Sequence, residues 1–258
     1  MPSATAQSTW DARIARAREL ASIRPAARDL LLFYATLAEY QRTLAAGARD
    51  AGTFDIDIVI KAIPGFLDWL RSAGRADLAD SVDVDCVTAA LRQKSNDSHS
   101  LPAEAGSHPS EAALFVVESL VQTFAEHFAN VDAAASASFP MRCPRCSAPP
   151  VAAVLREEGH GAKRLLLCAL CLEEWECLRM VCPACGEQEF DKLAVYTAEQ
   201  FTHVRIDACD RCHRYIKTID LSKDGLAVPC VDDIASVSLD LWARERGYTR
   251  IRQNVFGF

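Results

Sequence analysis

Four Cys-x-x-Cys pairs in the second half of the chain constrain its fold more than any other feature. Eight of the eleven cysteines form the pairs Cys143/Cys146, Cys168/Cys171, Cys182/Cys185 and Cys209/Cys212. Two residues between cysteines let one tight turn direct both sulfurs at a single ion, while backbone N–H groups donate to the thiolates. One such knuckle supplies half of a tetrahedral site. The four knuckles therefore predict two metal ions.

The lengths of the connecting segments predict which knuckles combine. Residues 147–167 separate the first two pairs and residues 186–208 separate the last two, and each connection is long enough for a hairpin. Residues 172–181 provide only enough chain for one strand that links two finished units. We expect sequential pairing, with a crossed arrangement as the alternative. The predicted sites are Cys143, Cys146, Cys168 and Cys171, and Cys182, Cys185, Cys209 and Cys212.

The pattern leaves the metal open, because a tetrahedral site of four sulfurs suits zinc and iron equally well. Zinc would staple small β units that are too poor in core to fold alone, whereas iron could also change its oxidation state. Cys86, Cys177 and Cys230 are isolated, and each is expected to be a small buried residue. His127, His160, His203 and His213 show no ligand spacing, although His213 directly follows Cys212 and could touch the surroundings of that site.

The composition of the chain changes near Phe139-Pro140. Before this point, apolar residues recur at helical spacing. Pro64 is expected to end one helix and restart the chain, and Ser110 is the expected cap of the last helix in this half. The predicted helical segments are 25–47, 56–63, 66–74, 83–92 and a helix after residue 110, with a polar loop over 95–109.

Beyond Pro140, short β-like runs alternate with the knuckles. The predicted strands are 151–156, 163–167, 175–181, 192–196, 203–207 and 215–219. They form two units of about three strands each, and a helix candidate over 232–246 follows. We predict an α+β fold in which a helical N-terminal domain precedes two tandem β modules of the rubredoxin or zinc-ribbon kind and a C-terminal helix. The predicted domains are 1–139, 140–181 and 182–258.

Charge and composition argue against several classes of protein. The formal net charge is −7, and residues 141–258 carry 16 Lys and Arg against 17 Asp and Glu, which is not the basic surface that nucleic-acid binding requires. No apolar run approaches the roughly 18 residues of a membrane span, and no signal peptide is evident. We therefore expect a cytoplasmic protein with reduced thiols. No phosphate-binding loop, nucleophile elbow or paired-carboxylate motif indicates an enzyme.

The second half of the chain resembles the FdhE family of formate dehydrogenase accessory proteins. The motifs that carry the resemblance follow in the family's order: Cys143-Pro-Arg-Cys-Ser-Ala-Pro-Pro-Val151, Leu167-Cys-Ala-Leu-Cys-Leu-Glu-Glu-Trp175, Cys182-Pro-Ala-Cys-Gly186, Cys209-Asp-Arg-Cys212, Asp232-Asp-Ile-Ala235, Leu239-Asp240 and Gly247-Tyr248. The helical half fits more loosely, through Ile63-Pro-Gly-Phe-Leu67. Where the family often has Gly after the first knuckle, this chain has Ser147, and Val255 stands where Pro is common.

The resemblance implies two rubredoxin-like modules that bind two iron ions per chain. It also implies a cytoplasmic role in which the protein associates with the catalytic subunit of a respiratory formate dehydrogenase and is needed for its activity. Two other functions stay open at this point. One is electron transfer through iron, and the other is a nucleic-acid-binding zinc ribbon, which the balanced charge of residues 141–258 disfavours.

Overall fold

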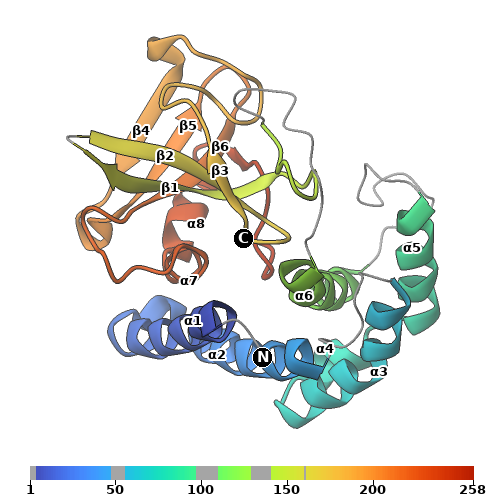
Figure 1. Cartoon of the computed structure of the whole chain (residues 1–258). Helices are drawn as coiled ribbons and strands as arrows, with labels where there is room; N and C mark the ends of the chain where they lie inside the picture. The colour runs from blue at the N-terminus through green and yellow to red at the C-terminus, as the bar shows by residue number, and fades with distance from the viewer. Residues whose placement is uncertain (1–3, 48–55, 97–109, 129–140, 160) are drawn as a thin grey trace. The chain divides into compact units, whose positions relative to one another are not determined.

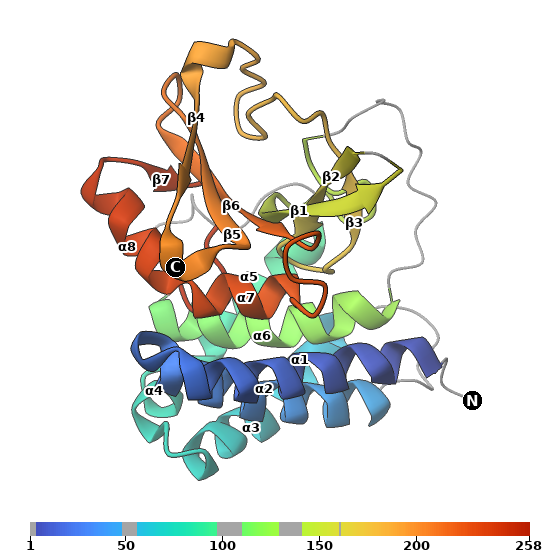
Figure 2. The same cartoon turned by 90° about the vertical axis from the view of Figure 1, so that its left-hand side faces the viewer.

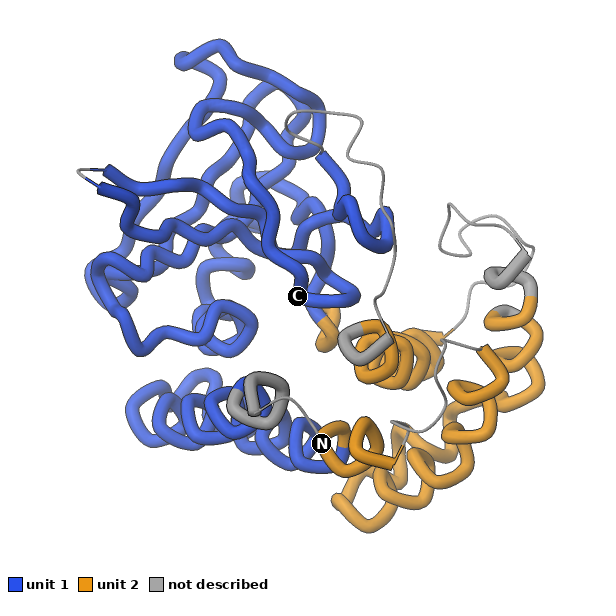
Figure 3. The backbone as a smooth tube through the Cα atoms, in the orientation of Figure 1, with its two compact units in different colours: residues 1–40, 131–254, 258 blue, residues 41–130, 255–257 orange. Residues whose placement is uncertain are grey.

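A computed structural model describes residues 4–47, 56–96, 110–128, 141–159 and 161–258. The chain divides into two compact units (Figure 3). The first unit combines residues 1–40 with residues 131–254 and 258, and the second contains residues 41–130 and 255–257. The helical N-terminal half is therefore shared between two units. The boundaries predicted at 139/140 and 181/182 follow changes of local structure along the chain, and as domain boundaries they stay a prediction.

The chain begins with α1, Ala4–Ile23, which is followed by a short 3-10 turn, Pro25–Ala27, and by α2, Arg28–Gly47 (Figure 1). Pro25 begins the turn because a proline at the first helical position loses no hydrogen bond. One face of α1 is buried at the three-to-four spacing of a helix. Its members are Trp10, Arg13, Ile14, Arg16, Ala17, Leu20 and Ala21.

The second unit contains α3 Ile56–Ser72, α4 Ala76–Asp80, α5 Val84–Asn96 and α6 Glu111–Phe128. The prediction that Pro64 ends a helix is wrong, because α3 continues through it. Val59, Ile63, Phe66, Leu67 and Leu70 are buried, and their burial outweighs the backbone bond that proline removes. At α6 the predicted cap is confirmed, since the Ser110 hydroxyl accepts the Ala113 N–H at 3.1 Å. Most of the predicted loop over 95–109 lies outside the described residues.

All the described strands belong to one seven-stranded sheet with the order β3-β2-β1-β6-β5-β4, and β7 pairs with β6. The strands are β1 Pro150–Glu158, β2 Gly161–Cys168, β3 Glu174–Glu176, β4 Leu193–Thr197, β5 Val204–Cys209, β6 Arg214–Asp220 and β7 Thr249–Arg250. Each Cys-rich module contributes an antiparallel group of three strands. The two groups join through the parallel pair β1 and β6, so the tandem modules share one sheet.

One face of the sheet is covered by two C-terminal helices, α7 Pro229–Ala235 and α8 Val237–Glu245 (Figure 1). The helix predicted over 232–246 is divided at Ser236, whose hydroxyl donates to the carbonyls of Asp232 and Asp233. Apolar residues of alternating strand positions pack beneath these helices. They include Ala152, Val154, Leu167, Val204, Ile206, Ala208 and Ile219, and Leu239 and Ala243 of α8 complete this core.

A charged network is also buried on this helix-covered face. The Lys217 ammonium group donates to an Asp240 carboxylate oxygen at 2.5 Å, and the Tyr215 hydroxyl donates to the other oxygen at 2.8 Å. Arg250 donates to Asp240 and to Asp233, so each buried cation has a carboxylate partner. Breaking such a network by removing one partner would leave an uncompensated buried charge.

The sheet is strongly curved, as the change of strand direction between β4 and β2 shows (Figure 2). Arg164 of β2 and Asp207 of β5 lie on the opposite face from the helices, and β1 and β6 stand between them in the sheet order. Nevertheless, Arg164 Nη2 lies 3.3 Å from Asp207 Oδ2. The curvature therefore brings the outer strands together over this face, where Arg164 is buried among residues such as Leu166 and Ile216.

The predicted α+β order of helical region, Cys-rich β region and C-terminal helices is confirmed. The third strand of the first module is shorter than predicted, because β3 ends at Glu176 rather than at Val181. After β3, Cys177 donates its N–H to the Arg164 carbonyl, and the chain then leaves the sheet toward the third knuckle. Among the described residues, no helix is both long and apolar enough to cross a bilayer.

Candidate metal centres

The first group of cysteines lies where β2 ends and where the chain enters β1. Cys143 and Cys146 occupy the turn before β1, whereas Cys168 is the last residue of β2 and Cys171 lies in the following turn. The Cys146 sulfur lies 3.3 Å from that of Cys168 and 3.5 Å from that of Cys171. Cys143 and Cys171 sulfurs are 3.6 Å apart. Three of these side chains are buried, and Cys146 is half-buried.

The second group lies at the turn between β5 and β6 and in the segment before β4. Sulfur atoms of Cys182 and Cys212 are 3.7 Å apart, and those of Cys185 and Cys209 are 3.8 Å apart. Cys182 and Cys209 are buried and Cys212 is half-buried, but Cys185 is exposed. Within each group the four sulfurs lie within 4.8 Å of one another, so the structure groups the knuckles sequentially and not in the crossed arrangement.

Four knuckles share one backbone geometry. The N–H of the first cysteine points to a carbonyl five residues ahead in three of them: Cys143 to Ala148, Cys168 to Glu173, and Cys182 to Glu187. In the fourth knuckle, Cys209 and Arg214 are opposite partners in the β5–β6 ladder at the same spacing. The residue after the second cysteine always has a positive φ. These residues are Ser147, Leu172, Gly186 and His213, with φ of 60°, 53°, 76° and 53°.

This geometry explains why glycine is favoured after such a pair. A left-handed residue costs a side chain about 1 to 2 kcal/mol, and glycine avoids that cost. Three knuckles here accept the strain with a side chain present. The turns also direct backbone N–H groups toward sulfur: Leu170 and Cys171 donate to the Cys168 sulfur at 3.3 and 3.4 Å. Ala184 donates to the Cys182 sulfur at 3.4 Å.

The distances between the sulfur atoms fit tetrahedral coordination of one ion by each group. With metal–sulfur bonds of about 2.3 Å, the edges of a tetrahedron of four sulfurs are about 3.8 Å long. The second group matches this length, and the first is slightly tighter, with separations of 3.3 to 3.6 Å. The same separations are far beyond the roughly 2.05 Å of a disulfide, and all eleven cysteines are free. The donor set therefore suits one thiophilic cation in each group.

The ionisation of the thiols shows what such a cation would change. The pKa of Cys143 is lowered because the thiols of Cys146 and Cys168 donate to its sulfur, and the pKa of Cys168 is raised because it supplies a proton to Cys143 and Cys146. In the second group, burial raises the pKa of Cys182. Desolvation opposes ionisation of Cys185, but the Glu187 N–H and the Cys212 and Cys182 thiols outweigh it and lower that pKa. A bound dication would hold all four sulfurs as thiolates.

An arginine–glutamate pair connects the two knuckles of each group. In the first, Arg145 Nη1 donates to Glu173 Oε2 at 2.8 Å, and in the second, Arg211 Nη1 donates to Glu187 Oε2 at 3.1 Å. In both cases the arginine precedes the second cysteine of one knuckle, and the glutamate comes two residues after the second cysteine of the other. The carboxylate of the second pair accepts further hydrogen bonds, because Glu187 Oε1 also accepts the N–H groups of Gln188 and Glu189.

The remaining cysteines do not join either group. Cys177 is buried after β3 and burial raises the pKa of its thiol. Cys230 is half-buried at the start of α7, with its sulfur 3.6 Å from the Tyr34 hydroxyl, and Cys86 is half-buried on α5. His213 is exposed and its ring lies 6.2 Å from that of Tyr248. Its part in the second group is the left-handed backbone after Cys212.

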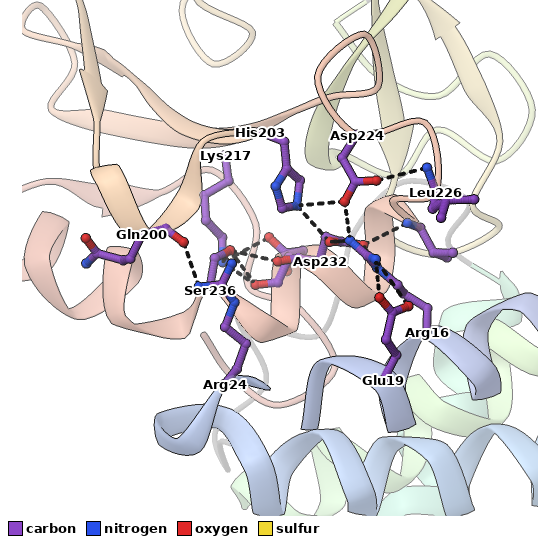
Figure 4. Close-up of polar contacts among 12 residues, drawn as sticks. Arg16, Glu19, Arg24, Gln200, His203, Lys217, Asp224, Leu226, Asp232 and Ser236 are labelled. Atoms are coloured by element: carbon purple, nitrogen blue, oxygen red, sulfur yellow. Dashed lines mark hydrogen bonds and ion pairs between the residues drawn. The ribbon is translucent and has the colours of Figure 1, made fainter. Parts of the chain in front are cut away.

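Sequence reasoning missed a third cluster of potential ligands, formed by His203, Asp224 and Asp232 (Figure 4). His203 Nε2 lies 2.8 Å from Asp232 Oδ1. However, the guanidinium of Arg16 from α1 already stands between the carboxylates, with Nη2 2.6 Å from Asp224 and 2.7 Å from Asp232. Desolvation opposes the charge of Arg16, but the two carboxylates outweigh it and raise its pKa. Arg16 thus acts as the cation of this cluster, and no spacing along the sequence signals the arrangement.

Comparison with known proteins agrees with this geometry. The model of the FdhE central domain matches residues 142–179, which contain the first group, and the model of the FdhE C-terminal domain matches residues 180–256, which contain the second. Residues 142–256 thus match the FdhE family, and these two segments hold the eight grouped cysteines.

Individual relatives extend the likeness over different lengths. A protein named as an FdhE homolog from Aquifex aeolicus is 43% identical over 121 residues, which are 46% of this chain and 43% of that protein. Another from Haemophilus influenzae strain PittEE is 26% identical over 99% of this chain and 90% of its own length. The crystal structure of FdhE from Pseudomonas aeruginosa covers 99% of this chain and 96% of its own at a TM-score of 0.66 and 24% identity. Because the two sequences are only 24% identical, this similarity shows a shared fold and nothing further.

Proposed function

We propose that this protein is an accessory factor for a respiratory formate dehydrogenase. It binds the catalytic subunit of that enzyme in the cytoplasm and is needed for its activity, without catalysing a reaction itself. The supporting observation is that two consecutive FdhE domains each position four thiols as one tetrahedral donor set. Partner binding follows from the family resemblance. Membrane insertion and nucleic-acid binding form no part of the proposal.

The eight grouped cysteines are the proposed ligands of two metal ions per chain, with iron favoured and zinc as the alternative. Four thiolates per ion satisfy either metal. When bound, iron would supply a one-electron change of oxidation state. The chain itself contributes the left-handed turns, the N–H groups directed at sulfur and the Arg–Glu pairs, which together hold the donors in place.

Metal content tests this part of the proposal. Protein purified without oxygen and without added metal should contain two metal ions per chain, and iron would give thiolate-to-iron charge-transfer absorption on oxidation. A variant with Cys86→Ser, which removes an isolated thiol, should retain both ions. Protein that contains one ion or none under these conditions, while remaining folded, would contradict the assignment.

Partner binding needs a separate experiment. The chain and the catalytic subunit of a respiratory formate dehydrogenase from the same organism should co-purify from a cytoplasmic extract, and deletion of the accessory chain should abolish formate oxidation. An unrelated protein with two zinc sites, each of four cysteines, is the control bait. Equal recovery of the dehydrogenase on both baits would remove the support for specific binding, whatever metal the chain contains.

Electron transfer is the second candidate function, and the exposure of Cys185 favours it at the second group. A sulfur at the surface shortens the path between a bound iron and an external redox partner. Reduction and reoxidation of iron at the second group, at a rate much faster than at the buried first group, would support this function. Zinc in both groups of anaerobically purified protein would eliminate it and leave the accessory role standing.

A further inference from the structure

A small cavity of about 60 Å³ lies beside the second cysteine group, on the sheet face opposite α7 and α8. Its wall includes the ligand residues Cys182 and Cys209, so the cavity reaches the buried side of that group. Four arginines and one carboxylate also line it: Arg164, Arg179, Arg205, Arg214 and Asp207. Such an excess of cations in a pocket raises the local concentration of anions.

Only part of this positive charge is neutralised within the protein. Arg205 Nε donates to Asp207 Oδ1 at 2.8 Å, and Arg164 Nη2 lies 3.3 Å from Asp207 Oδ2, so two arginines share one carboxylate. Arg164 is only 3% exposed, and its Nη1 donates to the carbonyls of Leu178 and Val181. Its Nε has no hydrogen-bond partner among the described residues. A buried guanidinium donor without an acceptor is costly unless a ligand or water supplies one.

Arg179 and Arg214 contribute charge at the mouth of the cavity. Both are exposed, and neither side chain forms a hydrogen bond or an ion pair with the part of the chain that the structure describes. The same mouth carries two exposed apolar side chains, Met180 at 48% and Val195 at 54%. Guanidinium donors below an apolar lip suit an anion that has an apolar portion, because the two parts of the ligand then find matching surroundings.

We propose that this pocket binds a carboxylate, which can be a free small acid or an acidic side chain presented by a peptide. The planar fork of an arginine matches the two oxygens of a carboxylate, and the cavity has room for a group of that size. The charge balance also permits it. Four arginines and Asp207 leave an excess of three positive charges, and four thiolates on a divalent ion would reduce this excess to one.

The alternative is that the arginines only balance the charge of the thiolates. In that case their loss would weaken retention of the second metal ion but would leave no saturable site for an external anion. The two explanations therefore differ in a binding measurement. They do not depend on whether the dehydrogenase is the partner.

The test uses the full chain, purified without oxygen with its own metal. It is titrated with sodium acetate, with inorganic phosphate, or with the uncharged-ended peptide acetyl-Leu-Glu-Leu-amide. The NMR methyl signals of Val195, which lines the cavity, report local binding. We expect the shifts of the Val195 signals to saturate with acetate or with the peptide, as for one binding site per chain. Arg179→Gln and Arg214→Gln should each raise the dissociation constant by about tenfold. Arg246→Gln is the matched control, because it removes an exposed arginine that stacks on Trp242 and does not line the cavity.

Each outcome decides the proposal. Tighter binding of the peptide than of acetate supports a carboxylate presented by a partner, and equal binding supports a free acid. Preference for phosphate overturns the assignment to carboxylates. Failure of both carboxylate probes to saturate, or an equal loss in Arg246→Gln, overturns the site itself. Metal content and far-ultraviolet circular dichroism must be unchanged in the three variants, which is expected because all three arginines are exposed.

Discussion

The two cysteine groups have the same local construction but differ in access to solvent. Each combines two knuckles with left-handed exits, N–H groups directed at sulfur and one Arg–Glu pair. In the first group no sulfur-bearing side chain is fully exposed, whereas Cys185 of the second group is exposed and Cys212 is half-buried. Local sequence therefore determines how the donors are arranged, and the position in the sheet determines what can reach them.

The two Arg–Glu pairs also differ in solvent exposure, and here the carboxylate of the more open second group is the better buried one. In the first group the arginine is the shielded partner, with Arg145 23% and Glu173 43% exposed. In the second group Arg211 is 65% exposed and Glu187 only 8%. The more open group thus has the more deeply anchored carboxylate. We interpret this carboxylate as compensation for the weaker cover over the second set of sulfurs.

The largest effect should come from replacing one of the eight proposed ligands. Cys168→Ser should abolish metal binding at the first group and lower the free energy of unfolding by more than about 4 kcal/mol, because the site closes the central β1–β2 hairpin. Cys185→Ser should also lose one metal ion but should leave most of the sheet folded. Metal analysis and urea unfolding measure both quantities. Equal losses of stability in the two variants would contradict the distinction between the groups.

A chelator should separate the two groups kinetically. An excess of a chromogenic chelator should remove the ion of the second group at least about tenfold faster, since the chelator can bind that ion and displace the exposed Cys185 thiolate without local unfolding. The absorbance of the metal–chelator complex should then increase in two phases of equal amplitude. Cys185→Ser, which lacks the open site, is the control and should show only the slow phase. A single phase in the unmodified protein would show that solvent access does not govern release.

The two carboxylates of the Arg–Glu pairs should differ in the same assay. Glu187→Ala should accelerate release from the second group by about fivefold, because it removes the acceptor of Gln188 N–H, Glu189 N–H and Arg211. Glu173→Ala in the first group should change release by less than about twofold, as expected for a half-exposed ion pair. A larger effect of Glu173→Ala than of Glu187→Ala would contradict this contrast between the two pairs.

The smallest effects should come from the left-handed residues. Gly186→Ala should lower the free energy of unfolding by about 1 kcal/mol, and the cause should be purely conformational, because a Cβ there would have no atom within 4 Å. Ser147→Gly should raise it by less than about 1 kcal/mol, since glycine relieves the strain but loses more entropy on folding. Thermal unfolding of the metal-loaded chain measures both changes. A stabilising Gly186→Ala would refute this account of the turns.

The sequence predicted the features that depend on neighbouring residues. The spacing of the knuckles and the lengths of residues 147–167 and 186–208 were enough to predict how the cysteines group. Ser110 was recognisable as a cap because its acceptor role involves a residue only three positions away. Strand positions in both modules follow from short runs rich in Val, Leu, Ile and Tyr, and their ends differ by a few residues from the prediction.

The features that escaped prediction depend on distant residues. The parallel pairing of β1 with β6 unites the modules in one sheet, and no local pattern distinguishes it from two separate sheets. Pro64 was interpreted as a helix end because its own preference was visible, whereas the burial of Val59 and Phe66 was not. Likewise, Arg16, His203 and Asp232 come together only after the whole chain has folded.

The contact between Arg16 and Asp232 spans 216 positions of the chain. During synthesis at about 5 to 20 residues per second, α1 leaves the ribosome roughly 10 to 40 seconds before its carboxylate partner on α7 is made. Throughout this interval, α7 is not yet available to pack against the buried face of α1, which contains Trp10, Ile14 and Leu20. The nascent protein is therefore exposed to aggregation for longest at its first helix, and the last helices to emerge complete the fold of the first.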